Sequence, residues 1–490
     1  MKNNKAVIIG CGIAGLSGAI RLKAGGIDVD VYEMNSYPGG KLTAFSKQGY
    51  RFDMGPSLFT MPQFMEELFD IAGKNIYDYF EYKKKDIVCN YFFEDGTRFQ
   101  AKADQEEFAK VAEETFDVSK NAIFQYFTES KKKYDLTAPI FLEKSLHKIN
   151  TYLSLGTTKA ILMMRDLHVN TSLHKYNTSK FSDNRLVQLF DRYATYNGSD
   201  PYKTPGIMSM IPHLEQYYGT YFPKGGMHSI TMSLFKLAKD IGVKFHFNSR
   251  VEKILVKGRK AVGVKVADGE KYANYVISNS DAVPTYRNLL KEQKAPEKVL
   301  KQQRSSSALI FYWGIRSKFP ELDLHNIFFS KNYKNEFDMI FKKKNVTEDP
   351  TVYINITAKE EIRDAPKGCE NWFVMINTPS NQDQDWEEII SRSRINITEK
   401  LSKYLGKDIS SLIEYEYVLD PRTIESNTMS YQGALYGAAS NNKFAAFMRH
   451  PNFTQKIKNL YFCGGSVHPG GGIPLCLLSG KIVSELIFGK

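Results

Sequence analysis

The sequence predicts an α/β protein in which one parallel sheet is assembled from distant segments of the chain. Two glycine-rich segments predict it, Ala6–Gly15 near the N-terminus and Leu460–Pro474 near the C-terminus. Each is a short apolar strand that runs into glycines and then into a helix-like pattern. A third observation is the return of a strand–helix–strand pattern at residues 220–283. A ligand held by both glycine-rich segments would organise the whole protein.

The N-terminal segment has the spacing of a dinucleotide-binding turn. Residues 7–9 form a short apolar run suited to a buried parallel strand, and the glycines that follow fit G-x-G-x-x-G. The first glycine permits a tight turn, the second lets the backbone approach a pyrophosphate, and the third lets a helix, expected at residues 13–24, pack closely. The N-terminal amides of that helix would face the phosphates. The candidate contacts are Gly10, Gly12, Ile13, Ala14 and Gly15.

A carboxylate follows this turn and helix at the end of the next strand. Residues 27–33 have the pattern of a second strand, and Glu33 ends it. A carboxylate at this place can accept hydrogen bonds from both ribose hydroxyls. Met34, beside it, is a further candidate contact. The alternative is a structural glycine turn with a surface glutamate, but the strand, helix, strand and acid in register favour a dinucleotide site.

The next residues favour FAD over NAD. The segments Tyr37–Lys41 and Gly49–Ser57 resemble the second and third FAD-contact segments of the flavin amine oxidase and carotenoid desaturase superfamily. Lys41 stands where arginine is commoner, and a lysine can reach a phosphate as a point charge without a bidentate fork. The alternative for Lys41 is a solvated surface charge. The contacts implied by the resemblance are Gly40, Lys41, Gly55, Pro56 and Ser57.

Size, cysteines and histidines bound the class of protein. At 490 residues, with 42% hydrophobic residues, the chain is long enough for two or three domains. It contains no run of 18 apolar residues, so no membrane-spanning helix is expected, and the short N-terminal apolar run does not resemble a signal peptide. The five cysteines lack C-x-x-C spacing and suit a reducing compartment. The nine histidines lack metal-ligand spacing, so no metal site is expected.

The net charge of +12 indicates either an anionic partner or a solubilising surface. No nucleic-acid recognition motif accompanies the charge, so nucleic acid is not expected as a partner. An anionic membrane surface would attract basic clusters by about 1 kcal/mol per residue. Each cluster taken alone is better explained as a solubilising face. The conspicuous clusters are Lys83 to Lys85, Lys131 to Lys133 and Lys342 to Lys344.

The order of elements divides the chain into five segments. A hairpin with an Asp-Gly turn is expected at residues 86–99, a mostly helical region at 104–190, and strands at 249–256 and 261–266. Residues 157–167 could form a helix in a lipid interface or a buried core helix, and both interpretations stay open. The predicted fold is α/β: a discontinuous Rossmann-like FAD-binding domain with an inserted α+β substrate domain, part of which is a helical subdomain able to contact a membrane. The segments are FAD-binding 1–75, substrate 76–219, FAD-binding 220–283, substrate 284–430 and FAD-binding 431–490.

The C-terminal glycine-rich segment is expected to hold the flavin. Residues 460–463 have the pattern of a buried strand, and the last helix is expected to begin near Gly472 with a proline in its first turn. A helix N-terminus aimed at the N1/C2=O edge of the flavin would stabilise the negative charge of the reduced ring. The alternative is a plain glycine-rich loop. The candidate contacts are Gly465, Gly472, Ile473 and Pro474, together with Val251, which would touch the adenine end as in related flavoproteins.

His468–Pro474 resembles the H-P-G-x-G-I-P signature of the bacterial-type carotenoid (phytoene) desaturases, and the resemblance covers essentially the whole chain. Residues 192–202 resemble the 1-hydroxycarotenoid 3,4-desaturases more than the phytoene desaturases. The resemblance implies an FAD-dependent oxidoreductase of carotenoid biosynthesis that makes a C–C double bond by hydride transfer to flavin. It also implies a cytoplasmic enzyme on the surface of the cytoplasmic membrane, with oxygen or a quinone as electron acceptor.

Chemistry of this kind depends on positioning and water exclusion more than on an acid–base group. Asp200, His213 and His468 are candidate bases, and each can also be explained as a structural residue. The Tyr and Arg residues of 192–202 could line a substrate channel. The alternatives are a phytoene desaturase, or a carotenoid isomerase or oxidase, of the same fold. In a different class, the alternative is a non-catalytic FAD-binding chaperone or assembly factor.

Overall fold

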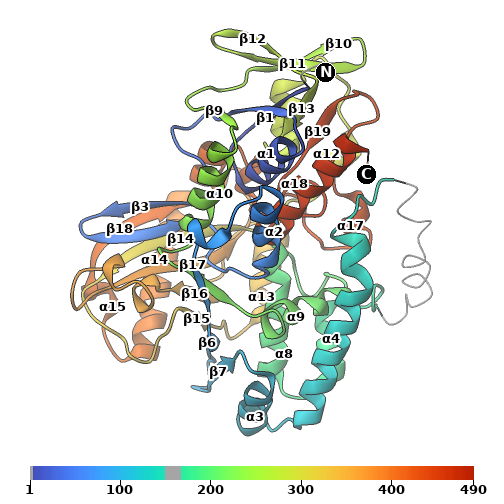
Figure 1. Cartoon of the computed structure of the whole chain (residues 1–490). Coiled ribbons are helices and arrows are strands. Elements are labelled where there is room, and N and C mark those ends of the chain that lie inside the picture. The colour runs from blue at the N-terminus through green and yellow to red at the C-terminus, as the bar shows by residue number, and fades with distance from the viewer. Residues whose placement is uncertain (1–3, 149–166, 490) are drawn as a thin grey trace.

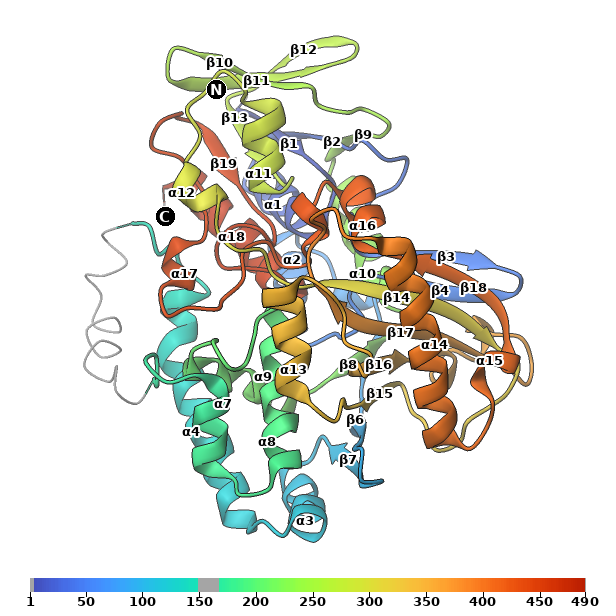
Figure 2. The same cartoon turned by 180° about the vertical axis from the view of Figure 1, so that it is seen from behind.

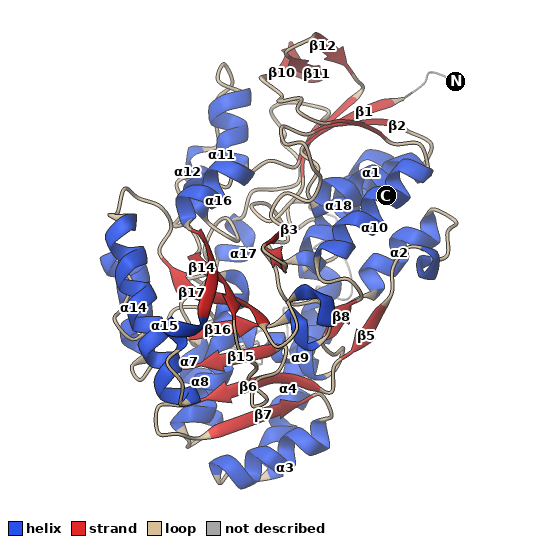
Figure 3. Cartoon of the chain, turned by 90° about the vertical axis from the view of Figure 1, so that its left-hand side faces the viewer, coloured by secondary structure: helices blue, strands red, loops and turns tan. Residues whose placement is uncertain are grey.

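A computed structural model describes residues 4–148 and 167–489. Two sheets organise these residues, one parallel and one mostly antiparallel, with helices packed around both (Figure 1, Figure 3). In the described residues, no helix is long and apolar enough to cross a membrane. Most of the helix predicted at residues 157–167 lies outside the described residues.

The parallel sheet has five strands in the order β19-β13-β1-β2-β9. The N-terminal residues supply the central strand β1 and its neighbour β2. The middle of the chain supplies β9 and β13, and the C-terminal segment supplies β19. Every pairing in this sheet is parallel. A sheet assembled from three separated stretches agrees with the predicted α/β class, whereas the residue limits of the predicted domains stay predictions. The strands are β1 (Lys5–Ile9), β2 (Asp28–Tyr32), β9 (Lys244–His246), β13 (Tyr275–Ser278) and β19 (Leu460–Phe462).

Side-chain alternation along β1 gives this sheet two buried faces. Ala6 and Ile8 pack into a core with helices, whereas Val7 and Ile9 pack against a small antiparallel sheet on the other side. Successive side chains of a strand point to opposite faces, so a strand that is apolar throughout is buried on both. The helices are α1 (Ile13–Ala24), α2 (Gln63–Ile71), α10 (His228–Asp240) and α18 (Ile473–Phe488), and the small sheet is β10 (Lys253–Lys257), β11 (Lys260–Val266) and β12 (Gly269–Tyr272).

The second sheet has seven strands in the order β18-β14-β17-β16-β15-β6-β7. Its pairings are antiparallel except that of β15 with β6. The predicted hairpin at residues 86–99 is confirmed as β6 and β7, with Gly96 at φ +87° in the turn. The strands are β6 (Ile87–Phe92), β7 (Arg98–Lys102), β14 (Ser307–Ile315), β15 (His325–Phe328), β16 (Val352–Asn355), β17 (Glu370–Thr378) and β18 (Ile413–Leu419).

Helices cover the second sheet (Figure 2). The long helix α14 (Trp386–Leu405) packs through an apolar core against β14, β16 and β17. A group of helices from the first half of the chain packs against β6, β7 and β15 through a second, aromatic core. These helices are α3 (Gln105–Phe116), α4 (Lys120–Phe141), α7 (Leu173–Lys180), α8 (Asn184–Asp191) and α9 (Ile211–Gln216). The remaining strands form two short antiparallel pairs. These are β3 (Thr43–Lys47) with β4 (Tyr50–Met54), and β5 (Tyr82–Lys84) with β8 (Tyr221–Pro223).

One predicted strand is shorter than expected. The pattern predicts a strand from residue 249, but β10 begins only at Lys253. The preceding residues cross the end of the parallel sheet, where the Ser249 amide donates to the Glu33 carbonyl. Arg250, Val251 and Glu252 then line a cavity, so this stretch belongs to the ligand-facing edge.

Candidate functional site

A cavity of about 710 Å³ is lined by residues of both sheets. At one end it meets the carboxyl ends of the parallel strands, where ligands bind in open α/β sheets. At the other it reaches the side chains of β14, β16 and β17. Of the predicted cofactor contacts, all but Gly15 line it. A Cβ on Gly15 would lie 2.5 Å from the Gly10 carbonyl oxygen, so this glycine packs the helix against the turn.

The N-terminus of α1 opens into this cavity without a capping side chain. Gly12 is the N-cap residue, and no side-chain cap hydrogen bond forms there. Ile13 and Ala14, the first residues of the helix, line the cavity. The first amides of a helix lack intrahelical partners, so an uncapped N-terminus is suited to an anion such as a pyrophosphate.

Glu33 is fixed at the end of β2. Its carboxylate accepts hydrogen bonds from the Cys11 amide (Oε2, 2.7 Å) and from the Asn35 amide (Oε1, 2.9 Å). A carboxylate has about four lone-pair sites, so each oxygen keeps one to offer. Glu33 lines the cavity, and its side chain can therefore accept further hydrogen bonds from a ligand such as a ribose.

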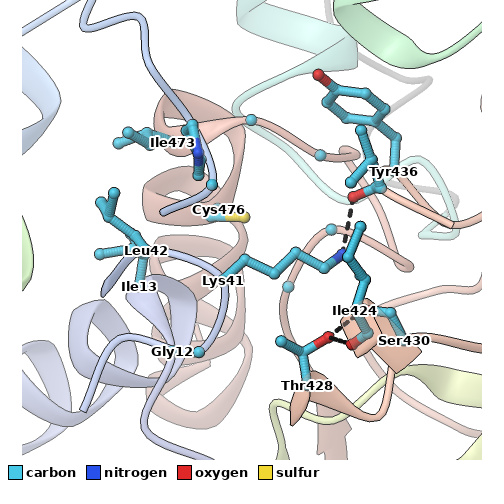
Figure 4. A pocket seen from close by; sticks show the side chains of 18 of the residues that line it. Gly12, Ile13, Lys41, Leu42, Ile424, Thr428, Ser430, Tyr436, Ile473 and Cys476 are labelled. Carbon is cyan, nitrogen blue, oxygen red and sulfur yellow. Dashed lines mark hydrogen bonds between the residues drawn. The ribbon is translucent and has the colours of Figure 1, made fainter. Parts of the chain in front are cut away.

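The N-terminus of α18 opens into the same cavity. Its N-cap is Gly472, at φ +103°, again with no side-chain cap. A Cβ on Gly472 would meet no protein atom within 4 Å, whereas one on Gly471 would lie 2.6 Å from a Tyr436 ring carbon. The backbone at Gly472 is therefore open toward the cavity, whereas at Gly471 it packs closely against Tyr436. Figure 4 shows Gly12 and Ile473, from the two helix N-termini, together at the cavity wall.

Close packing of two helices holds these two N-termini side by side. The Ser17 hydroxyl on α1 donates to the Leu477 carbonyl on α18 at 2.8 Å. Gly18 and Gly480 meet at the crossing, where a Cβ on Gly480 would lie 2.8 Å from the Gly18 amide nitrogen. Small residues let the helix axes approach closely, so the two N-termini form one anion-attracting wall.

Lys41 crosses the cavity from the loop before β3 (Figure 4). Its ammonium donates to the carbonyl of Leu435 at 2.9 Å and to that of Ala434 at 3.3 Å. Burial lowers the pKa of Lys41, and the nearby Asp281 carboxylate opposes that shift. Lys41 is therefore a cavity residue bonded to two backbone carbonyls. The surface-charge alternative is wrong, and its contact with a phosphate stays a prediction.

These features fit FAD. The two uncapped helix N-termini suit a pyrophosphate and an electron-rich flavin edge, and Glu33 suits a ribose. Gly40 and Gly465 keep the wall free of side chains on either side. Within residues 4–148 and 167–489, no group of three or more His, Cys, Asp or Glu side chains is placed to hold a metal.

The end of the cavity at the seven-stranded sheet is mainly apolar. A chamber of this kind suits a hydrocarbon, because apolar atoms gain roughly 25 cal/mol for each Å² removed from water. Polar groups form two small clusters in it. One is Ser57, Tyr353 and His325, and the other contains Arg192 and Glu215. The apolar lining residues are Val88, Ile310, Ile327, Met375, Leu419, Ile424 and Leu435.

Arg192 lies deep in the wall of this chamber, as the predicted channel segment suggested. It is 8% exposed and donates to the Tyr91 hydroxyl at 2.6 Å and to Glu215 at 3.3 Å. The Tyr193 hydroxyl donates to the same Glu215 oxygen at 2.5 Å. Thr195 and Tyr196 line the cavity beside Arg192. The pair is bonded through one guanidinium nitrogen, whereas Arg192 Nε is buried without a hydrogen-bond partner among the described residues.

The three candidate bases lie outside the residues that line the cavity. Asp200 accepts from the Tyr202 amide at 2.9 Å, and burial raises its pKa. His213 packs among tyrosine rings, and burial lowers its pKa to about 4. His468 shares a hydrogen bond of 2.8 Å with the Lys144 carbonyl, and burial lowers its pKa to about 4 as well. Their placement gives a catalytic role no support, and that role stays an untested prediction.

Asn279 is a site residue that the sequence interpretation missed. Its side chain accepts from the Gly12 amide at 3.1 Å and donates to the Cys463 carbonyl at 3.2 Å. It thereby joins both glycine-rich segments across the end of β13. A polar run directly after an apolar strand was the available signal, since such positions lie at the ligand-binding edge of a parallel sheet.

A dinucleotide cradle that opens into a mainly apolar chamber fits a flavin-dependent oxidoreductase. The profile of the family described as flavin containing amine oxidoreductase matches residues 13–328. A 1-hydroxycarotenoid 3,4-desaturase of Flavobacterium sp. (strain P99-3) is 59% identical over 483 residues, which cover 99% of each chain. A 4,4'-diaponeurosporene oxygenase of Staphylococcus aureus (strain MSSA476) is 32% identical over 98% of this chain and 97% of its own. The chain belongs to the flavin-containing amine oxidoreductase family and, within it, to the carotenoid desaturases.

Solved structures share this fold at low sequence identity. A variant of putrescine oxidase superposes with a TM-score of 0.67 at 14% identity, covering 99% of both chains. An oxidoreductase from Methanosarcina mazei gives 0.63 at 17% identity, covering 99% of this chain and 100% of its own. These structures show the fold, whereas the family match and the 59% identical relative confirm the predicted family and its FAD cofactor.

Proposed function

We propose that this protein is an FAD-dependent desaturase that makes the 3,4 double bond of a 1-hydroxycarotenoid. The observation that carries the proposal is the continuous cavity, which joins the dinucleotide cradle to an apolar chamber without an intervening wall. The 59% identity to a 1-hydroxycarotenoid 3,4-desaturase supports the choice of bond and substrate.

The protein contributes positioning, electrostatics and water exclusion. When bound, FAD would supply the acceptor for a hydride from a carbon beside the polyene, and the neighbouring carbon would release a proton to complete the double bond. The apolar chamber side chains hold a hydrocarbon chain in one orientation and keep water out. The N-terminus of α18 directs its positive end into the cavity, which stabilises negative charge that develops there.

Flavin bleaching tests this proposal. Protein loaded with FAD is mixed anaerobically with one lipid-dispersed carotenoid, and flavin absorbance and product absorption are followed. We expect bleaching with a 1-hydroxycarotenoid and little with phytoene. Bleaching with phytoene instead would favour a phytoene desaturase, and oxygenated products would favour an activity like that of the Staphylococcus relative. Absence of bleaching with every carotenoid would favour a non-catalytic FAD-binding protein.

We further propose that the protein works in the cytoplasm, attached peripherally to the anionic surface of the cytoplasmic membrane. A carotenoid does not diffuse freely through water, since each buried CH₂ is worth about 0.8 kcal/mol. Helix α17 (Ala445–Met448) supports the proposal with Phe447 and Met448, which are 42% and 41% exposed. The ring of Phe447 packs at 5.5 Å from that of Phe141, at the end of α4 in the helical region.

Vesicle binding tests the membrane proposal. We expect the protein to co-sediment with anionic vesicles at low salt and to be released by high salt, because surface charges are screened. Phe447→Ser should weaken binding. Ile362→Ser, at an 83% exposed position in another part of the molecule, is the matched control and should leave it unchanged. Failure to bind anionic vesicles would overturn the proposal.

Oxygen or a membrane quinone remains the proposed electron acceptor, and turnover with each alone decides between them.

A further inference from the structure

A polar chain of four residues crosses the wall of the apolar chamber. The Ser57 hydroxyl lies 2.8 Å from the Tyr353 hydroxyl, which in turn lies 2.8 Å from His325 Nδ1. The Asn355 side-chain nitrogen lies 3.2 Å from the same His325 Nδ1. Ser57, Tyr353 and His325 all line the cavity. Buried polar groups in an apolar wall are costly unless hydrogen-bonded, so a group that faces the cavity there is placed to bind something polar.

The partners of His325 determine the direction of these hydrogen bonds. Asn355 Nδ2 also lies 3.1 Å from the Leu324 carbonyl oxygen. Because a carbonyl only accepts, the end of the Asn355 amide at this place is its NH₂ group and not its oxygen. An amide NH₂ cannot accept, so in its hydrogen bond with His325 Nδ1 the amide donates and the ring nitrogen is the unprotonated acceptor. Burial lowers the pKa of His325 to about 3, in agreement with a neutral ring. The proton of this ring is then on Nε2, which has no hydrogen-bond partner among the described residues.

It follows that Tyr353 presents an acceptor to the cavity. Its single O–H donates to His325 Nδ1, whose one lone pair is shared between this shorter bond (2.8 Å) and the longer one from Asn355 (3.2 Å). The phenol oxygen keeps two lone pairs, and the Ser57 hydroxyl occupies at most one. A ligand atom that pairs with the remaining lone pair must carry a proton. A hydroxyl satisfies this requirement, whereas a hydrocarbon, an ether or a ketone does not.

The position of Ser57 relates this acceptor to the reacting bond. Ser57 directly follows Gly55 and Pro56, which line the cavity in the predicted flavin-contact segment. In a 1-hydroxycarotenoid, the carbon that bears the hydroxyl is two bonds from C3. A group that binds this hydroxyl must therefore lie beside the cofactor, and not at the far end of the chamber.

We propose that Tyr353, held by Ser57, His325 and Asn355, accepts a hydrogen bond from the 1-hydroxyl of the substrate and so determines specificity for hydroxylated carotenoids. This inference rests on the proposed function. The Arg192–Glu215 pair is a weaker candidate, because Arg192 is always protonated and can only donate, so it cannot tell a hydroxyl from a methoxy group. A substrate without the hydroxyl would leave the phenol oxygen unpaired, which lowers kcat/KM by roughly ten- to a hundredfold.

The test compares a 1-hydroxycarotenoid with its 1-methoxy analogue, which can accept a hydrogen bond but cannot donate one. With the FAD-loaded wild-type protein we expect a kcat/KM ratio of roughly ten to a hundred in favour of the hydroxyl. In Tyr353→Phe the ratio should fall toward one. Ser57→Ala should lower it partly, because the phenol loses one of the groups that orient it. Tyr404→Phe, which removes a buried phenol hydroxyl on α14 outside the cavity lining, is the matched control and should keep the wild-type ratio.

The outcomes separate the two proposals. A wild-type protein that turns over neither carotenoid contradicts the proposed function. A wild-type protein that desaturates the 1-hydroxycarotenoid, with Tyr353→Phe and Ser57→Ala keeping the full ratio, contradicts only the role of Tyr353. A structural role alone would slow both substrates equally and leave the ratio unchanged, so it is excluded by the expected result. If Tyr353→Phe fails to retain FAD, the ratio measured with Ser57→Ala decides.

Discussion

The Asn279 side-chain oxygen accepts a hydrogen bond from the Gly12 amide at 3.1 Å, across 267 residues of sequence. Its nitrogen donates to the Cys463 carbonyl at 3.2 Å. One amide side chain therefore fixes the spacing between the two glycine-rich segments that line the cofactor end of the cavity. Asn279 can reach both segments because it directly follows β13, the strand that lies between β1 and β19.

Asn279→Ala should weaken FAD binding. The substitution leaves a buried amide and a buried carbonyl without these partners, and each such loss costs about 1 kcal/mol or more. We expect the dissociation constant for FAD to rise roughly tenfold, measured by titrating the apoprotein and following flavin fluorescence. Unchanged affinity would show that the two segments keep their spacing without this side chain.

Gly480→Ala should destabilise the protein although alanine favours helices. The new Cβ would lie 2.7 Å from Ser17 Oγ and 2.8 Å from the Gly18 nitrogen, so the helices must move apart at a cost of about 1–3 kcal/mol. The matched control is Gly18→Ala, whose Cβ would meet only the Gly480 Cα at 4.0 Å. Thermal unfolding should show a lower midpoint for the first variant and an equal or higher one for the second. A higher midpoint for Gly480→Ala would contradict the close crossing.

Acid should destabilise the protein partly through His213. Its pKa falls from 6.5 to about 4 on folding because the ring is buried, with Asp135 opposing and Lys131 adding to the shift. Between these values the unfolded chain binds a proton that the folded protein does not. Stability therefore falls as pH falls from about 6.5 to 4, by at most about 1.4 kcal/mol per pH unit.

His213→Gln should reduce this dependence on pH. Unfolding by urea at pH 7 and pH 5 should give a smaller loss of stability in the variant than in the wild type. Turnover near neutral pH should fall no more than the loss of folded protein explains, because His213 does not line the cavity. A loss of turnover at full FAD content would restore His213 as a catalytic candidate.

Lys41→Met should weaken FAD binding and leave the apoprotein less ordered around the cavity. The change removes a positive charge and two hydrogen bonds to the Ala434 and Leu435 carbonyls. Hydrogen bonds to charged groups contribute about 1.5–3 kcal/mol, so we expect affinity for FAD to fall tenfold or more. Lys47→Met, on the exposed part of β3, is the control and should bind FAD normally. Equal affinities in the two variants would contradict a role for Lys41 in the site.

Local pattern was enough to predict the elements that surround the cofactor. The helix predicted at residues 13–24 is α1, and the one predicted near Gly472 is α18. Both follow from glycine spacing and apolar runs, which depend on neighbours in sequence. Membership of the family followed in the same way, because its motifs are short and contiguous.

The polar wall of the chamber could not be predicted in this way. Ser57 and Tyr353 touch across 296 residues, and Tyr353 and Asn355 alternate with two apolar residues in a strand of four. Only the packing of β16 against the flavin-contact segment brings them together. The candidate bases do not line the cavity, and the sequence could not show this in advance. A buried histidine such as His468 has the same sequence signal whether it lies in a cavity or in a packed core.

The order of strands in the parallel sheet has a consequence for synthesis in the cell. Strand β1 leaves the ribosome first, yet its neighbour β13 and the edge strand β19 emerge much later. At roughly 5–20 residues per second, the delay between β1 and β19 is on the order of tens of seconds. Until residues 251–278 have emerged, β1 lacks its neighbour β13 and the small sheet that covers Val7 and Ile9. The cofactor end of the cavity also needs Gly464 to Cys476, so a complete FAD site exists only after nearly the whole chain has been made.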